Sequence, residues 1–242
     1  MIADTVVRNA VRVAKGAFME GAYLGPYPHI REITLGHSQR VSQYVGILVG
    51  EMSIKGWGGY LTRERRSDYQ IAALLHDLGK FAIPPEILSK QGIHSEKETT
   101  IMREHTIKGH SILQDIEMRF KTGRMYSSPS KPLLAFVEGC GELFLLEKVV
   151  AAHHHERWDG QGYPEGLKAE KIPLSARIVA VADVYDALTS ERPYRQIAHP
   201  HEIAAYMIES LKGSQLDPNV VEAFERVEQS FKKTLKRFSD AK

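Results

Sequence analysis

Apolar residues recur at intervals of three and four along most of this chain, and this spacing places them on one face of an α-helix. The C-terminal segment shows the pattern clearly, because Asp217-Pro218 is a helix-start signal and an apolar stripe follows it. That stripe comprises Val220, Phe224, Val227, Phe231, Leu235 and Phe238. Short stretches rich in Gly, Pro and Ser separate the helical segments. The pattern predicts an all-α fold.

Further helices are expected at several places. Ser95 followed by Glu98 is a capping-box signature, so a helix should run from there to about residue 116. Apolar spacing and breaker residues predict the other elements: helices over 7–18, 37–52 and 68–80 and from Pro200 towards Gly213, and a loop over 119–135. The stretch at 174–190 is apolar almost all round, and its periodicity leaves open whether it is a buried strand or a central helix.

Composition excludes several classes of protein. The 32 basic and 30 acidic residues nearly cancel, which argues against a nucleic-acid polymer as partner. The lone Cys140 rules out an internal disulfide and fits a reducing cytoplasm. No apolar run approaches the length of a membrane span, and charged residues interrupt the N-terminal segment too often for a signal peptide. We therefore expect a cytoplasmic protein that binds no membrane.

The eleven histidines are numerous for this length, and three of them are adjacent in the stretch HHHERWDGQGYP at 153–164. A single histidine is most often a surface or core residue, but three together suggest a metal site whose other ligands come from distant segments. Residues of ligand type in apolar surroundings occur in four further segments, at His37, His76, Asp77, His105 and Asp183.

Asp183 is the clearest of these, because a carboxylate inside IVAVADVYDAL would be costly to bury without a cation or a hydrogen-bond network. Adjacent residues on a helix point about 100° apart. The pairs His76-Asp77 and His154-His155 therefore suit two metal ions, or a bridging residue, better than one mononuclear site. With carboxylates present and thiolates absent, iron or manganese is expected rather than structural zinc.

The chain resembles the HD-GYP subgroup of the HD phosphohydrolase superfamily. The matching segments, in order, are LGHSQRV, LLHDLGKFAIPPEILSK, MREHTIKGHSIL, HHHERWDGQGYPEGL, IPLSARIVAVADVYDALTSERPYR and LDPNVVEAF. This resemblance implies an all-α helical bundle over residues 29–242, preceded by an N-terminal helix or linker at 1–28. It also implies hydrolysis of the bacterial second messenger cyclic di-GMP to pGpG or GMP, with two divalent metal ions as cofactors.

The resemblance also assigns roles to individual residues. It makes Asp77 the bridging ligand and, with Lys80, a catalytic residue, while Lys80 would contact the region of the scissile phosphate. It implies that Tyr163, Arg192 and Arg195 bind the substrate, the two arginines through its phosphates. The implied metal ligands are His37, His76, Asp77, His105, His154, His155 and Asp183. The remaining histidines fall outside the ligand pattern: His29, His94, His110, His153, His199 and His201.

Two departures from the family pattern are apparent. Some members hold a third metal through a glutamate four residues before the first ligand histidine; that position is Ile33 here, with Glu32 one place away, which favours a binuclear site. Residues 119–147 form a longer stretch than usual, which would serve as a lid or as an interface. The N-terminal segment is either a linker remnant or an element of a homodimer.

Alternative functions remain open at this stage. The chain could be a non-catalytic receptor for cyclic di-GMP, although it retains every expected ligand position. It could also be an HD hydrolase that acts on another nucleotide, including a different cyclic dinucleotide, because phosphate-binding residues do not distinguish bases. In this family the GYP loop is linked to association with diguanylate cyclase (GGDEF) domains, so GQGYPEGL is either a partner surface or a wall of the substrate pocket.

Overall fold

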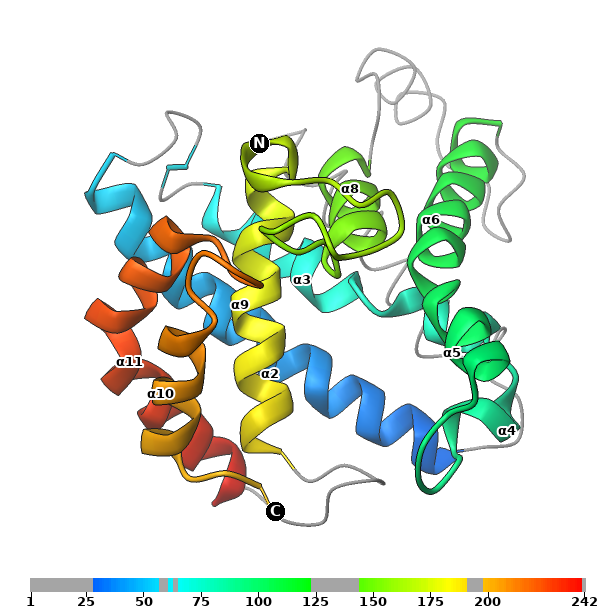
Figure 1. Cartoon of the computed structure of the whole chain (residues 1–242). Coiled ribbons are helices and arrows are strands. Elements are labelled where there is room, and N and C mark those ends of the chain that lie inside the picture. The colour runs from blue at the N-terminus through cyan, green and yellow to red at the C-terminus, as the bar shows by residue number, and fades with distance from the viewer. Residues whose placement is uncertain (1–27, 57–60, 63–64, 123–143, 191–197, 241–242) are drawn as a thin grey trace.

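The computed structural model describes residues 28–56, 61–62, 65–122, 144–190 and 198–240 of the 242-residue chain. Every regular element in these ranges is a helix, which confirms the predicted all-α class (Figure 1). The longer helices are α2 (Pro28–Ile54), α3 (Arg66–Leu75), α5 (Glu96–Arg103), α6 (His105–Lys121), α8 (Leu145–His153), α9 (Leu174–Thr189), α10 (His201–Ser210) and α11 (Pro218–Ser239). The short ones are α4 (Pro85–Leu88) and the 3₁₀ turns η1 (Leu78–Ala82) and η2 (Ala169–Lys171). None of the described helices is both long enough and apolar enough to cross a membrane.

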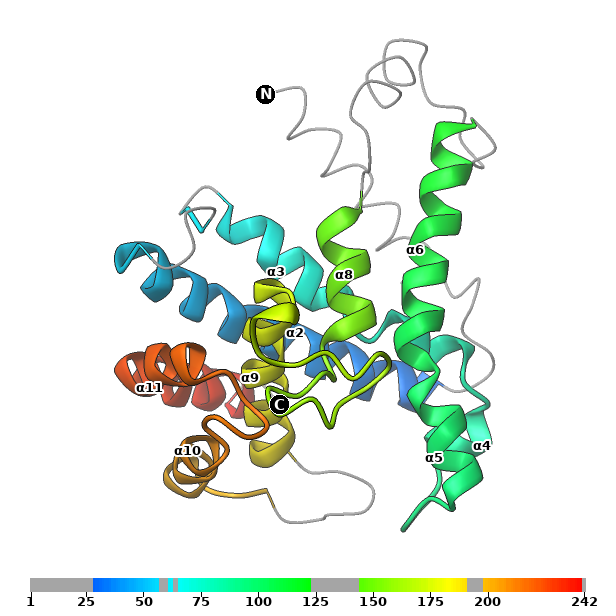
Figure 2. The same ribbon diagram turned by 45° about the horizontal axis from the view of Figure 1, so that its top comes forward.

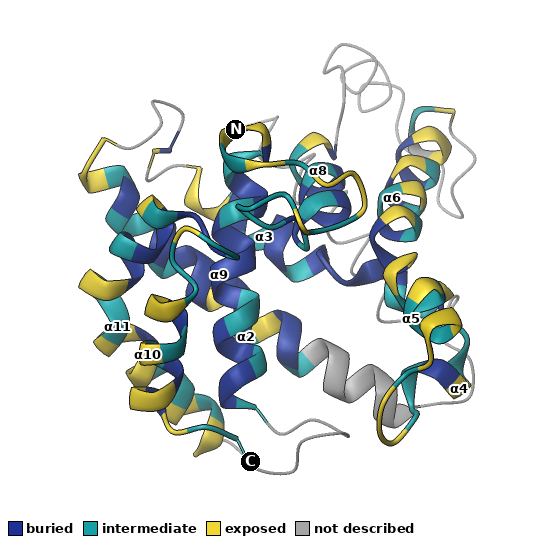
Figure 3. Cartoon of the chain, viewed as in Figure 1, coloured by how far each residue is buried: buried dark blue, intermediate teal, exposed yellow. Residues whose placement is uncertain are grey.

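Helix α9 resolves the ambiguity of the apolar stretch at 174–190, because it is a central helix and not a strand. It packs against α2, α8, α10 and α11, so nearly all of its circumference is buried (Figure 3). A helix surrounded in this way carries apolar or small residues on every side, which explains the missing amphipathic pattern. Figures 1 and 2 place α10 and α11 on one side of α9, and α4, α5 and α6 on the other.

Two apolar clusters hold the described helices together. The larger one joins α2, α3, α8, α9, α10 and α11. Its aromatic centre includes Tyr44, whose ring stacks on Phe231 with centroids 4.6 Å apart. The smaller one joins α3, η1, α6 and α8 through Leu75, Leu78 and Leu113. Helix α3 contacts both α2 and α8. Its C-terminal end therefore has a fixed position between the two clusters.

Several predicted boundaries need correction. Helix α2 begins at Pro28 and not near His37, since proline is well suited to the first helical position. The helix expected over 68–80 ends at Leu75 and gives way to η1. The capping box at Ser95 is confirmed, but the helix it starts ends at Arg103, and α6 begins two residues later.

Other expectations agree with the structure or lie outside the described residues. Helices α10 and α11 begin directly after Pro200 and at Pro218, as predicted, and Asp217 caps α11 by accepting a hydrogen bond from the Asn219 N–H at 2.8 Å. Helix α6 continues to Lys121 in the segment expected to be a loop. The predicted N-terminal helix and residues 123–143 of the longer stretch lie outside the described residues.

Candidate metal centre

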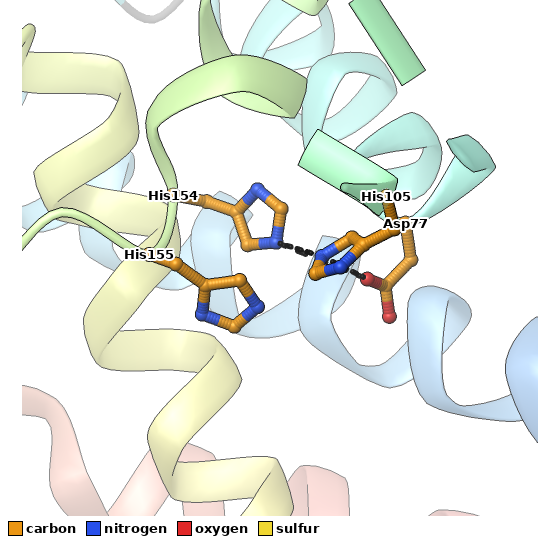
Figure 4. Close-up of side chains that lie close together, drawn as sticks. All are labelled: Asp77, His105, His154 and His155. Atoms are coloured by element: carbon orange, nitrogen blue, oxygen red, sulfur yellow. Dashed lines mark hydrogen bonds and ion pairs between the residues drawn. The ribbon is translucent and has the colours of Figure 1, made fainter. Parts of the chain in front are cut away.

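The seven residues expected to bind metal lie together in two adjacent groups. One group comprises Asp77, His105, His154 and His155, and the other comprises His37, His76 and Asp183. Within each group the potential ligand atoms all lie within 4.8 Å of one another. They come from α2, the turn after α3, the start of α6, the end of α8 and the middle of α9. Side chains from five segments therefore converge on a small volume, part of which Figure 4 shows.

Asp77 belongs to the first group and also lies beside the second. Its Oδ2 atom is 3.3 Å from His76 Nε2 and 3.5 Å from His37 Nε2. Its Oδ1 atom is 3.5 Å from His105 Nε2 and 3.8 Å from His154 Nε2 (Figure 4). Oδ1 is buried and has no hydrogen-bond partner among the described residues. Each carboxylate oxygen thus faces one set of histidines, which is the arrangement expected of a bridging ligand.

Hydrogen bonds at Nδ1 orient four of the histidine rings towards the centre, three to backbone carbonyls and one to a carboxylate. Four rings place Nδ1 against an acceptor: His37 on Asp186 Oδ2 at 2.7 Å, His76 on the Ala73 carbonyl at 2.6 Å, His105 on the Met102 carbonyl at 2.7 Å, and His154 on the Val150 carbonyl at 3.0 Å. A carbonyl can only accept, so Nδ1 of His76, His105 and His154 carries the proton, and Nε2 of a neutral ring then presents a lone pair. Hydrogen bonding of this kind is typical of histidines that bind metal through Nε2.

The Nε2 atoms face each other in pairs. His37 and His76 are 3.3 Å apart at these atoms, and His105 and His154 are 3.4 Å apart. Two lone pairs at this separation repel each other unless a proton or a cation lies between them. Together with the unpartnered Asp77 Oδ1, this donor set of nitrogen and carboxylate oxygen fits divalent metal ions.

Burial and charge set the protonation states that metal binding requires. Burial opposes ionisation of Asp77, but Lys80 and His76 hold its pKa well below the usual carboxyl value. Burial also opposes the charged ring of His37, yet its hydrogen bonds to the carboxylates of Asp183, Asp186 and Asp77 raise its pKa to about 10. By contrast, burial lowers the pKa of His155 to about 3.

These pKa shifts give a cluster of ionised carboxylates and mostly neutral imidazoles. Metal ions bind imidazole only in its neutral form, so His154, whose pKa burial holds well below its ordinary value, is ready to bind. The raised pKa of His37 shows that the carboxylates attract a positive charge at that point. A bound cation would supply that charge in place of the proton.

The grouping differs in part from the expectation for adjacent residues. His76 and Asp77 fall into separate groups, as the pair argument predicted, but His154 and His155 fall into the same one. The premise of a continuous helix was wrong, because α3 ends before His76 and α8 ends at His153. Lys80 donates a hydrogen bond to Asp77 Oδ2 at 2.5 Å, so in this structure its ammonium group lies beside the cluster.

Sequence reasoning missed Asp186, the second carboxylate of VADVYDAL. It is fully buried, accepts a hydrogen bond from His37 and forms a bidentate ion pair with Arg40 at 2.6 and 2.9 Å. The cost of burying a charge, which singled out Asp183, applies equally to Asp186 three residues later. Asp183 points its Oδ1 atom at His37 Nε2, 3.1 Å away, whereas Asp186 holds the opposite nitrogen of the same ring.

Replacing Asp186 with asparagine should weaken metal binding by about 10- to 100-fold, because the ring of His37 would lose the carboxylate that orients it. Competition with a chelator would measure the change in affinity. The control is Asp115→Asn, which alters an exposed pair with Arg119 on α6 and should leave the affinity unchanged. Equal affinities for the two variants would show that Asp186 serves only the packing of Arg40.

The GYP turn covers one side of the centre. The Tyr163 ring stacks on His155 with centroids 4.9 Å apart, and the Arg103 guanidinium lies 5.0 Å from the centroid of Tyr163. Buried Glu156 fixes the turn by accepting hydrogen bonds from the Glu165 and Leu167 N–H groups at 2.8 and 3.0 Å. A cavity of about 380 Å³ opens beside the turn and is lined by residues that include His154, His155, Tyr163 and Asp183.

Other residues singled out from the sequence lie outside the part of the chain that the structure describes. Arg192 and Arg195 lie in the segment 191–197, outside the described residues, and the side chains of Glu32 and Ile33 are likewise outside them. Some of the histidines expected not to bind metal have other partners. His94 bonds the Ile87 carbonyl at 2.9 Å, and His201 bonds the Tyr185 hydroxyl at 2.8 Å.

Comparison with known proteins agrees with this site. The HD domain family model matches residues 144–220, which include α8, the GYP turn, α9 and α10. A cyclic di-GMP phosphodiesterase of Thermotoga maritima is 39% identical over 204 residues, covering 84% of this chain and 47% of that protein. A probable cyclic di-GMP phosphodiesterase of Vibrio cholerae serotype O1 is 37% identical over 208 residues, which cover 86% of this chain and 43% of that protein. The 3′3′-cGAMP-specific phosphodiesterase 2 of the same organism is 36% identical over 151 residues, which cover 62% of this chain and 24% of that protein.

The helical fold, the His/Asp clusters and these matches define a class: the chain belongs to the HD domain family. Within that family it is of the HD-GYP type, with HDLGK at 76–80 and GYP at 162–164. The chain spans less than half the length of the curated relatives described above.

Proposed function

We propose that this chain is a phosphodiesterase that hydrolyses cyclic di-GMP to pGpG or GMP at a binuclear metal centre. The observation that carries the proposal is the position of Asp77, whose two oxygens face separate groups of histidines. The names of the relatives from Thermotoga maritima and Vibrio cholerae support the choice of substrate. Because the chain matches less than half of those proteins, their activity is carried over here as a proposal.

The residues of the two groups would hold two divalent cations, with iron or manganese preferred for this set of nitrogen and oxygen donors. When bound, such ions lower the pKa of water and offset negative charge on a phosphoryl oxygen. The rest of the chemistry falls to the chain itself. Lys80 lies within hydrogen-bond distance of Asp77 and would orient a phosphate oxygen at the centre. Tyr163, stacked on His155, would form one wall of the substrate pocket.

A second candidate substrate is 3′,3′-cGAMP, since one relative is named as specific for it. A non-catalytic receptor is a third candidate. Purified protein loaded with manganese should be incubated with cyclic di-GMP, 3′,3′-cGAMP and cyclic di-AMP, and the products resolved by chromatography. We expect pGpG or GMP from cyclic di-GMP at the highest kcat/KM. Preferred cleavage of 3′,3′-cGAMP would establish the second candidate, and binding without cleavage of any of the three would establish the receptor.

Arg192 and Arg195 are proposed to hold the substrate phosphates. They are three residues apart in SERPYR, a spacing that would bring them to one face of a helical turn. Arg192→Ala should lower kcat/KM for cyclic di-GMP about tenfold or more, because a charge-assisted hydrogen bond contributes roughly 1.5–3 kcal/mol. Metal content and thermal stability should not change. If Arg192→Ala matches the wild type and the control Arg119→Ala in kinetics, the phosphates are held elsewhere.

The GYP turn is further proposed to bind a diguanylate cyclase (GGDEF) domain. Pro164, Glu165 and Gly166 are exposed, whereas Tyr163 is partly buried against His155, so the outer part of the turn is available to a partner. Pro164→Ala should weaken capture of a GGDEF domain in a pull-down while leaving hydrolysis of cyclic di-GMP within twofold of the wild type. Undiminished capture by this variant would contradict the partner role.

A further inference from the structure

The cavity beside the GYP turn has two arginines in its lining, and they differ in their partners. Arg157 is occupied: it donates to both carboxylate oxygens of Asp159 at 3.1 and 2.6 Å and to Gln215 Oε1 at 3.0 Å. The side chain of Arg103 forms no hydrogen bond or ion pair with the residues that the structure describes, and its guanidinium contacts the face of the Tyr163 ring. Arg103 is therefore the cationic group of this lining whose donors are available to a ligand.

Arg103 completes a row of planar groups that begins at the metal centre. His155 belongs to the group of Asp77, Tyr163 stacks on His155 with an interplanar angle of 28°, and Arg103 lies over Tyr163. Arg103 is the last residue of α5, two positions before His105 of the same group, so its backbone is anchored to the site. A dinucleotide with one phosphate at the centre would extend along this row.

The chemistry of the row suits a purine base. Nucleobases stack on aromatic rings and on guanidinium planes, and arginine donates two parallel hydrogen bonds to O6 and N7 of guanine. Adenine offers an amino donor in place of O6, so it cannot accept both bonds. The Arg103 guanidinium lies over the Tyr163 ring, and its N–H groups have no partner among the described residues, so they are available for such a contact.

We propose that Arg103 is a specificity-determining residue, which binds the guanine base of the substrate through O6 and N7. The inference deepens the proposed function and rests on it. It assigns to this chain a contact with the base, whereas Lys80, Arg192 and Arg195 would serve the phosphates.

The test compares Arg103→Ala with the wild type on three substrates: cyclic di-GMP, cyclic di-AMP and bis(p-nitrophenyl) phosphate, a small diester that has no base. Arg103→Ala should raise KM for cyclic di-GMP about tenfold and leave KM for cyclic di-AMP within twofold. Turnover of the small diester and metal content should not change. Arg103→Lys should not restore the preference for cyclic di-GMP, because an ammonium group lacks the planar fork. Arg119→Ala, which removes an arginine on α6 that is absent from the cavity lining, is the matched control.

Other outcomes would overturn the inference. An equal rise in KM for both dinucleotides, with rescue by Arg103→Lys, would mean that Arg103 contacts a phosphate. Loss of activity on the small diester would mean that it supports the metal centre. Unchanged kinetics on all three would mean that it touches no substrate. If wild-type protein cleaves the small diester but no cyclic dinucleotide, the proposed function is overturned as well. If the wild type and Arg103→Ala hydrolyse cyclic di-GMP with the same KM, this inference alone is overturned.

Discussion

Replacing Asp77 with alanine should remove metal and activity together. The wild type should contain about two metal ions per chain, since its seven potential ligands form two groups and Asp77 lies close to histidines of both. Without this carboxylate both groups lose an oxygen donor, so metal content should fall below one ion per chain. Hydrolysis should fall on the order of a thousandfold or more, because metal ions stabilise such transition states by several kcal/mol.

Elemental analysis of the purified protein would measure the metal, and chromatography the hydrolysis of cyclic di-GMP. Asp115→Ala is the control, since it also removes an aspartate but at an exposed position on α6. Circular dichroism would establish that the Asp77 variant still folds. Full metal occupancy in Asp77→Ala would show that Asp77 is not a bridging ligand. A single zinc ion in the wild type would contradict the binuclear iron or manganese centre.

Replacing Gly79 with alanine should disrupt both folding and the metal centre. This glycine of HDLGK lies where η1 meets the start of α6, and a Cβ atom there would fall 1.8 Å from the His105 carbonyl oxygen and 2.5 Å from the Gly109 nitrogen. Both obstacles are backbone atoms, so the two segments would have to separate. We expect a loss of about 3 kcal/mol in the free energy of unfolding, at the upper end for overpacking. We also expect weaker metal binding, because Asp77, Lys80 and His105 would move apart.

Urea unfolding in the presence of a chelator would measure stability, and chelator competition would measure metal affinity. Gly50→Ala is the control: it lies within α2, where the nearest atom to the new methyl group is an Arg66 nitrogen at 3.8 Å. Alanine is the better helix former by roughly 0.5–1 kcal/mol, so this control should be neutral or stabilising. If Gly79→Ala unfolds at the same urea concentration as the wild type and binds metal equally well, the close approach of η1 to α6 is not essential.

Much of this protein was predictable from short patterns. Helix starts at Ser95, after Pro200 and at Pro218 follow from capping and from the fixed backbone of proline, which act within a few residues. The seven residues of the two groups were named from motifs that follow one another along the chain as in the family, and the structure brings all seven together. Asp183 could also be singled out from the sequence, because a buried carboxylate needs a partner.

Tertiary contacts decided the rest, because they join residues that local patterns do not relate. Helix α9 could have been a strand by its composition, and only its position among four other helices explains why it is apolar on every side. Asp183 and Asp186 are both carboxylates within the same apolar stretch, so the local sequence does not distinguish them. In the structure Asp183 faces Nε2 of His37, whereas Asp186 lies at Nδ1 of the same ring.

The same applies to the metal centre and to the groups around it. The chain leaves the helix after Leu75, and the glycine of the following turn lies directly against the backbone of α6. That packing places Asp77 between its neighbour His76 and histidines from three other segments, and it could not be foreseen from the motif alone. The contact of the Arg103 guanidinium with the Tyr163 ring likewise joins residues 60 positions apart. By itself the sequence determined which side chains could bind metal, whereas the packing of the helices decided which atom of each side chain faces the centre.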